Sequence, residues 1–190
     1  MHALAKSLLI GALAGSAASA LATDSSPPAT ASHAGNHDFD FEFGEWHMEL
    51  SRRVKPLSGS NEWLKYEGTS IVRKVWNGAA NIGEIELDGP KGHIEGMTLR
   101  VFNPDAKQWN VHFANSASGV VGDAMVGGFR DGRGEFYNQE TLNGRSIFVR
   151  FIFSDMTDRT FALEQAFSAD GGKTWEANWI ATFRKVQSKA

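Results

Sequence analysis

From Phe39 onward, short apolar runs alternate with turn signals rich in Gly, Pro, Asn and Asp. Asn-Gly and Asp-Gly pairs favour the positive φ angles of tight hairpin turns. About nine such signals divide the chain into about ten strands at near-constant spacing, which predicts an all-β fold, a single antiparallel meander barrel spanning roughly residues 43–186. The signals are PLSGSN (56–61), WNGA (76–79), DGPKG (88–92), NPDAKQ (103–108), NSASG (115–119), RDGRG (130–134), NGR (143–145), DMTDR (155–159) and ADGGK (169–173).

The alternation of apolar and polar positions is clearest near the C-terminus. Successive side chains of a strand point to opposite faces, so the apolar, odd-numbered set is predicted to face the interior. A β-propeller would require an internal repeat of roughly 40–50 residues, and the sequence shows none. We therefore expect one closed barrel with an aromatic-lined interior. The odd-numbered set comprises Ile147, Val149, Phe151, Phe153, Phe161, Leu163, Phe167, Trp175, Ala177, Trp179, Ala181 and Phe183.

The stretch FSADGGKTWE (167–176) carries Ser-x-Asp-x-Gly-x-Thr-Trp, a pattern that resembles the Asp-box of sialidases. The motif occurs once, and its residue types suit a hairpin: an Asp that accepts backbone N–H bonds, a Gly in a special conformation and a packed Trp. We interpret it as a structural turn between the last two strands, with the Asp170 carboxylate bonded to backbone N–H groups of residues 170–174.

The N-terminus has the pattern of an export signal. Lys6 supplies a positive charge, SLLIGALAG (7–15) is an apolar region too short to span a bilayer, and small residues follow. We predict a signal peptide over residues 1–20, cleaved after Ala20 or Ala22, a disordered lead-in at 21–37 and the barrel at 38–187. An uncleaved membrane anchor is the alternative, and the short apolar region disfavours it. The predicted location is periplasmic or secreted, without a membrane anchor.

Composition excludes several classes of function. The formal net charge is -3 and no basic cluster is present, so nucleic acid is not an expected partner. The chain has no Cys, which rules out disulfides, thiolate nucleophiles and Cys-ligated metals. No His-x-His or His-Glu-x-x-His spacing occurs. We expect no metal and no cofactor, and nothing in the sequence predicts the oligomeric state.

The first predicted strand begins with Gly44-Glu45-Trp46 after a Phe-rich lead, and this Gly-x-Trp resembles the opening of lipocalins and their calycin relatives. The resemblance implies a Trp at the closed end of the barrel with an Arg from the last strand packed over it, a role that Arg184 would take. Alternation places Arg184 on the outward face. The contact therefore requires a bulge or a barrel-end position, or else the pair is coincidental.

Longer stretches resemble a group of uncharacterised secreted bacterial proteins with lipocalin-like barrels. The resemblance covers most of residues 38–186, and it implies the fold and export. The stretches that carry it are FDFEFGEWHMELSRRVKPLSGSNEW, LRVFNPDAKQW, GEFYNQETLNGR and EQAFSADGGKTWEANW.

Two sets of polar residues are candidates for a site. Arg150, Glu164 and Asn178 share a parity on neighbouring predicted strands, and form either a cluster in a polar cavity or a ladder on the outer face. Tyr137 and Gln165 are polar members of the otherwise apolar parity. They either bond one another inside the barrel, with Glu135 and Gln139 beside Tyr137, or orient a ligand.

These patterns lead to three functional hypotheses. The first is an exported protein that binds a small lipophilic or aromatic molecule. The second is a cofactor-free isomerase, cyclase or lyase in the same barrel, with Tyr137 and either Glu135 or Glu164 as acid and base. The third is an interaction module with a barrel filled by its own side chains. The ligand-binding residues of the first hypothesis are Trp46, Trp109, Tyr137, Phe151, Gln165 and Trp179.

Overall fold

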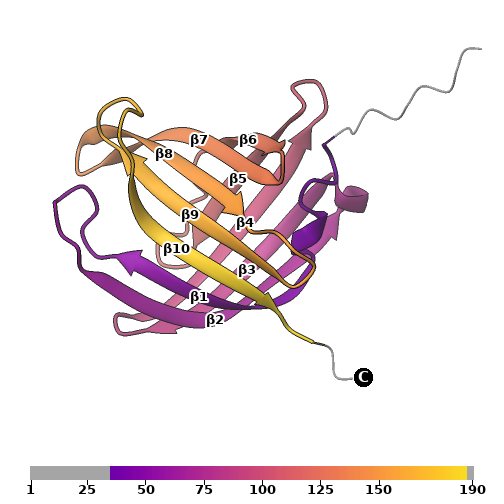
Figure 1. Ribbon diagram of the computed structural model, residues 1–190, viewed down its shortest axis with the longest axis horizontal. Helices are drawn as coiled ribbons and strands as arrows, with labels where there is room; N and C mark the ends of the chain where they lie inside the picture. Colours follow the sequence, from indigo (N-terminus) through magenta and orange to yellow (C-terminus); the bar gives the residue numbers. More distant parts are fainter. Residues whose placement is uncertain (1–34, 188–190) are drawn as a thin grey trace, which may run out of the picture. The chain divides into compact units, whose positions relative to one another are not determined.

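The computed structural model describes residues 35–187, which form ten antiparallel strands closed into one barrel (Figure 1). Each strand pairs with the next along the chain, and β1 pairs with β10 to close the sheet. The predicted all-β meander barrel of about ten strands is confirmed, whereas the predicted signal peptide and residues 21–34 of the predicted lead-in lie outside the described residues. The strands are β1 (Gly44–Arg53), β2 (Trp63–Val75), β3 (Ala80–Gly89), β4 (Gly92–Asn103), β5 (Gln108–Asn115), β6 (Met125–Arg130), β7 (Arg133–Leu142), β8 (Arg145–Ser154), β9 (Thr160–Ser168) and β10 (Glu176–Lys185).

Two predicted hairpin turns show why the chain reverses where it does. Asp131 and Gly132 connect β6 to β7 with φ angles of 51° and 73°, and Asn143 and Gly144 connect β7 to β8 with φ angles of 51° and 76°. Two consecutive positive φ angles give a two-residue loop the twist that matches its flanking strands. Asn, Asp and Gly tolerate this conformation better than other residues, so these dipeptides fix the register of three strands.

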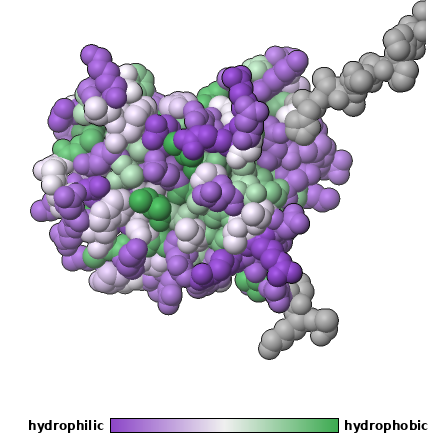
Figure 2. All heavy atoms as spheres, in the orientation of Figure 1, coloured by the Kyte–Doolittle hydropathy of each residue, from purple (hydrophilic) through white to green (hydrophobic). Residues whose placement is uncertain are grey.

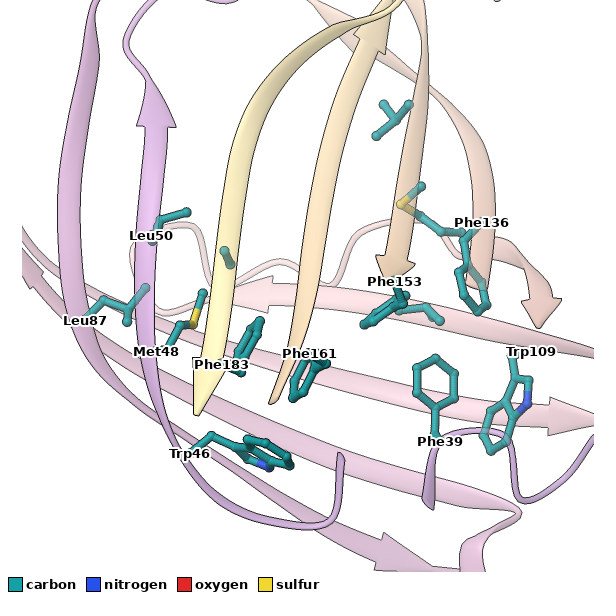
Figure 3. Close-up of a cluster of buried hydrophobic side chains, with 14 of the residues drawn as sticks. Phe39, Trp46, Met48, Leu50, Leu87, Trp109, Phe136, Phe153, Phe161 and Phe183 are labelled. Atoms are coloured by element: carbon teal, nitrogen blue, oxygen red, sulfur yellow. The ribbon is translucent and has the colours of Figure 1, made fainter. Parts of the chain in front are cut away.

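Residues 35–43, here called the N-terminal segment, close one end of the barrel. The segment contains the 3-10 turn η1 (Asp40–Glu42). Phe39 is fully buried, with its ring centre 4.9 Å from those of Trp109 on β5 and Phe129 on β6, and 5.4 Å from that of Phe153 on β8. These edge-on contacts reach three strands, so one ring joins β5, β6 and β8 at this end of the barrel. Figure 3 shows Phe39 beside Trp109 and Phe153.

A β-bulge in β10 changes which residues face the interior. Ala177 pairs with Ala166 on β9, but Trp179 pairs with Gln165, so Asn178 is an extra residue without a partner of its own. A bulge of this kind reverses the alternation of side chains along a strand. The predicted inward positions of Trp175 and Ala177 are therefore wrong, whereas the predicted inward position of Trp179 is correct.

Charged and polar side chains cover most of the face shown in Figure 2, with apolar residues scattered between them. Within residues 35–187, no helix has the length and hydropathy needed to cross a bilayer.

Candidate functional site

The barrel contains a cavity of ≈ 90 Å³ between its walls. Its lining is mainly apolar, and a few polar side chains are placed among the rings and aliphatic groups. The apolar contributions come from Met48, Ile85, Phe113, Phe151, Leu163, Trp179 and Phe183, and the others from Glu42, Ser70, Gly83, Thr98, Arg100 and Gln165. An apolar cavity with few polar groups is the usual composition of a small-molecule site.

The cavity exists because large side chains do not fill this level of the barrel. Phe153 and Phe161, which face the interior nearer the N-terminal segment, are fully buried. Phe151 on β8 and Trp179 on β10 both lie opposite Gln165 on β9, and both are only half-buried. Trp179 itself lines the cavity. Free volume therefore lies next to the Trp179 ring.

A buried polar cluster of Glu42, Asn81 and Arg100 lies at one side of the cavity. Arg100 Nη1 on β4 donates a hydrogen bond to Asn81 Oδ1 on β3 at 2.9 Å. The same nitrogen lies 2.7 Å from Oε2 of Glu42, which the N-terminal segment contributes. The exposed fractions of Glu42, Asn81 and Arg100 are 1%, 0% and 6%. An ion pair this deep needs close geometry, because each charge has lost its hydration.

Glycine at position 83 makes room for this cluster. A Cβ there would lie 2.6 Å from Thr98 Oγ1 and 3.4 Å from Arg100 Nη1. The first distance is well inside a van der Waals contact, so any larger residue would displace Thr98 or the guanidinium. Gly83 thus keeps side-chain volume out of the cavity beside Arg100.

Burial changes the ionisation of both charged members of the cluster. Loss of hydration raises the pKa of Glu42, and the positive charge of Arg100 opposes that rise. Burial lowers the pKa of Arg100, and the charge of Glu42 opposes it. Glu42 and Arg100 therefore each favour the charged form of the other, while burial opposes the charged form of both.

Of the predicted ligand-binding residues, Phe151, Gln165 and Trp179 line the cavity. Gln165 Nε2 donates a hydrogen bond of 2.6 Å to Oδ1 of Asn178, the bulge residue, which is itself buried. This bond fixes the orientation of the Gln165 side-chain amide. Asn178 is therefore bonded to a residue that lines the cavity, whereas Arg150 and Glu164 pair with each other elsewhere.

Trp46 and Trp109 do not line the cavity, which corrects the prediction for both. Trp46 is fully buried and donates from Nε1 to the carbonyl oxygen of Glu42 at 2.7 Å. Trp109 is also fully buried and donates to the carbonyl oxygen of Gly35 at 2.9 Å. Both indoles anchor the N-terminal segment, so their role in this structure is to hold that segment in the barrel end.

The residue over Trp46 is Lys185. Of the two alternatives for Arg184, the structure shows the outward position that alternation gives and not the contact that the resemblance implies. Lys185 lies directly opposite Trp46 in the β1–β10 pairing, and its Nζ is 5.0 Å from the ring centre. Arg184 has the opposite parity and pairs on the outer face with Glu49. The Gly-x-Trp resemblance placed the Trp correctly at the closed end and assigned the cation one residue too early.

The residues proposed as acid and base lie on the outside of the barrel. Tyr137 is 42% exposed, and its hydroxyl donates to Glu135 Oε2 at 2.8 Å. The expected inward position of Tyr137 and Glu135 is wrong because Phe136 takes the interior position on β7. Hydrogen bonds from Arg133 and Tyr137 lower the pKa of Glu135, which does not suit a general base at neutral pH.

The third proposed acid or base also faces outward. Glu164 forms an ion pair of 3.2 Å with Arg150, and the guanidinium lies 4.6 Å from the centre of the Trp175 ring. Of the two alternatives for Arg150 and Glu164, the structure therefore shows the outer-face ladder.

The Asp-box is the structural turn that was predicted. Asp170 Oδ1 accepts a hydrogen bond from the backbone N–H of Thr174 at 2.9 Å, and Oδ2 accepts one from the Thr174 hydroxyl at 2.7 Å. Trp175 Nε1 donates to the carbonyl oxygen of Gly172 at 3.0 Å. The bonds from Thr174 and Ser168 lower the pKa of Asp170 to about 2.

Sequence reasoning missed Glu42, Asn81 and Arg100. On β4, Thr98, Arg100 and Phe102 face inward while Leu99 and Val101 face outward, so the apolar residues beside Arg100 conceal its position. A signal was present in the neighbouring residues. Trp109 pairs directly with Phe102, and correct placement of these two aromatic residues inside the barrel would have placed Arg100 there as well.

The chain is therefore a closed antiparallel β-barrel with an internal cavity. No protein-family model matches the sequence, and no curated protein matches it. The S-type phycobiliprotein lyase CPES from Guillardia theta is similar in structure, with a TM-score of 0.55 and 12% identity over 80% of this chain and 92% of that chain. At this identity the similarity concerns the barrel fold.

Two further solved structures are more distant. EF1p2_mFAP2b bound to DFHBI has a TM-score of 0.45 and 8% identity, covering 80% of this chain and 99% of that chain. The redesigned β-barrel mFAP0 bound to DFHBI has a TM-score of 0.43 and 10% identity, covering 76% of this chain and 99% of that chain.

Proposed function

We propose that this chain is an exported binding protein that holds a small, mainly apolar molecule inside its barrel. The observation that carries the proposal is the cavity beside the half-buried ring of Trp179, with apolar walls and the polar cluster at one side. A barrel filled by its own side chains would leave no such space, so the cavity favours binding over a purely structural role.

The size of the cavity limits the ligand. Its volume of ≈ 90 Å³ is below the ~150 Å³ of an engineered apolar cavity that holds benzene. We therefore propose a molecule with a single ring or a short chain, accommodated by a small movement of the walls. Trp179 and Phe151 are half-buried, so they have more freedom to move than the packed rings nearer the N-terminal segment.

The test is to identify what the protein holds. The full chain is expressed with its own N-terminus, collected from the periplasm or medium, and extracted under denaturing conditions for mass spectrometry of small molecules. We expect an apolar molecule of one ring or a short chain, and a protein mass that lacks the first 20 or 22 residues. Protein that carries no such molecule and binds no single-ring probe would contradict the binding function. Absence of the protein from both the periplasm and the medium would contradict export, and an intact N-terminus on exported protein would contradict the cleavage.

A second candidate function is proton transfer on the bound molecule. Tyr137, Glu135 and Glu164 lie outside the barrel, but Glu42 lines the cavity and burial raises its pKa. A carboxylate of this kind is suited to removing a proton from carbon and returning it. The test is incubation of a cyclic ketone with the protein in D₂O. Deuterium uptake that requires Glu42, compared with the Glu42→Gln variant, would support the enzyme; equal uptake with both would reject it.

A further inference from the structure

The polar cluster leaves hydrogen-bonding groups unused beside the cavity. A guanidinium has five N–H donors, and the hydrogen bond and ion pair that Arg100 makes both use Nη1. Among the described residues, Nε of Arg100 and Nδ2 of Asn81 are buried donors without a hydrogen-bond partner. Oε2 of Glu42 also has no hydrogen bond, but it already faces Arg100 as its ion-pair partner. Donors buried without partners cost free energy, so a molecule in the cavity that supplies an acceptor is favoured over one that does not.

The charge of the ligand follows from the pair already present. Glu42 Oε2 lies 2.7 Å from Arg100 Nη1, and its negative charge balances the positive charge of Arg100. A ligand carboxylate placed on Arg100 would also approach Glu42, and the two negative charges would repel each other in a site with little water. A ligand cation would meet Arg100 with the same difficulty. An uncharged acceptor avoids both costs and still takes a hydrogen bond from an ionised donor.

We propose that the molecule held in the cavity carries an uncharged carbonyl-type acceptor, which takes its hydrogen bond from Arg100 while the apolar part packs against Trp179 and Phe151. The proposal rests on the binding function above and specifies its ligand class. Arg100, Trp179 and Phe151 all line the same cavity, so one small molecule meets the guanidinium with its polar end and the aromatic rings with its apolar end.

Three probes of nearly equal shape test this on the wild-type protein. They are isopropenylbenzene, acetophenone and benzoate, which place a methylene, a carbonyl oxygen and a carboxylate at the same position on one ring. Binding is followed by NMR of a ¹⁵N-labelled sample, in which indole and arginine Nε–H signals are both visible. We expect acetophenone to bind at least about tenfold more tightly than either other probe, because it alone adds an uncharged acceptor.

Each result of this comparison has one meaning. Equal binding of acetophenone and isopropenylbenzene would overturn the proposed ligand class and leave the binding function standing. Tightest binding of benzoate would also overturn it and would indicate an anionic ligand. No binding of any of the three, with no co-purifying molecule, would contradict the binding function itself.

The Glu42→Gln variant adds a test of the charge argument. Without the Glu42 carboxylate, no negative charge balances Arg100, so the affinity of benzoate should rise at least about tenfold relative to that of acetophenone. Trp175→Phe on the outer face is the matched control and should leave the ranking unchanged. An unchanged ratio of the benzoate and acetophenone affinities in folded Glu42→Gln protein would overturn the proposal. Where circular dichroism shows that this variant does not fold, the wild-type ranking and the shift of the Arg100 Nε–H signal with acetophenone decide.

Discussion

Glu42 Oε2 and Arg100 Nη1 lie 2.7 Å apart, although Glu42 comes from the N-terminal segment and Arg100 from the middle of β4. Both side chains are almost completely buried. The pair therefore links the closing segment to the barrel wall through two charges that have little access to water.

The first prediction concerns the stability of this pair. Arg100→Met should lower the free energy of unfolding by about 3–5 kcal/mol, because Glu42 loses the cation that offsets its burial and must either keep an unpaired charge or bind a proton. The double variant Glu42→Leu with Arg100→Met should recover at least half of that loss, since no buried charge remains. Urea denaturation of the two variants and the wild type measures both values. A single substitution that costs less than about 1 kcal/mol would show that the pair is hydrated and structurally unimportant.

The second prediction concerns the walls of the cavity. Trp179→Ala should weaken the binding of isopropenylbenzene or a similar single-ring probe by about 1–3 kcal/mol, because the indole that packs against the probe is lost. Trp175→Ala removes the same side chain from the outer face and serves as the control. Tyr137→Phe should also leave binding unchanged, since Tyr137 faces outward. Equal losses from Trp179→Ala and Trp175→Ala would place the bound probe outside the barrel.

The third prediction separates the two cations at the end of β10. Lys185→Ala should destabilise the protein by about 0.5–1 kcal/mol through loss of its contact with the Trp46 ring, and Lys185→Arg should preserve stability. Arg184→Ala removes only a surface ion pair with Glu49 and should have a smaller effect. Thermal unfolding of the three variants gives the order. A larger loss for Arg184→Ala than for Lys185→Ala would contradict the assignment.

The fourth prediction uses the acid titration of Asp170. Its pKa is lowered to about 2 from an ordinary 3.8, so the folded state releases this proton more readily than the unfolded state. The resulting stabilisation is present above about pH 4 and is lost as the pH falls towards 2. Asp170→Asn should lower the melting temperature by a few degrees at pH 6, and the difference from wild type should shrink as the pH falls. A difference that stays constant from pH 6 to pH 2 would contradict this.

The strands were predictable from the sequence because their turns are encoded locally. Asn143-Gly144 and Asp131-Gly132 determine where the chain reverses, whatever the rest of the molecule does. The interior was predictable only in part, since strict alternation fails at a bulge. The pairing of Ala177 with Ala166 and of Trp179 with Gln165 depends on the neighbouring strand, which no pattern within β10 reveals.

The polar side of the cavity was not predictable from strand patterns for a related reason. Glu42 belongs to a short 3-10 turn outside the strands, and it reaches Arg100 only because Phe39 packs among rings from three strands. Its burial results from tertiary packing alone. By contrast, the inward positions of Phe151 and Trp179 were predicted correctly, because both agree with the alternation of apolar and polar residues along their strands.

The pairing of β1 with β10 has a consequence for how the protein folds. The barrel closes by joining the first strand to the last, so Met48 lies opposite Phe183 although the other eight strands separate them in sequence. Contacts between residues so distant in sequence form slowly, and all-β proteins dominated by them fold on the order of milliseconds to seconds. Until β1 pairs with β10, each of these strands has one edge without hydrogen-bond partners, and their inward-facing side chains remain exposed to water. The period between synthesis and closure is therefore when this chain is most prone to aggregate.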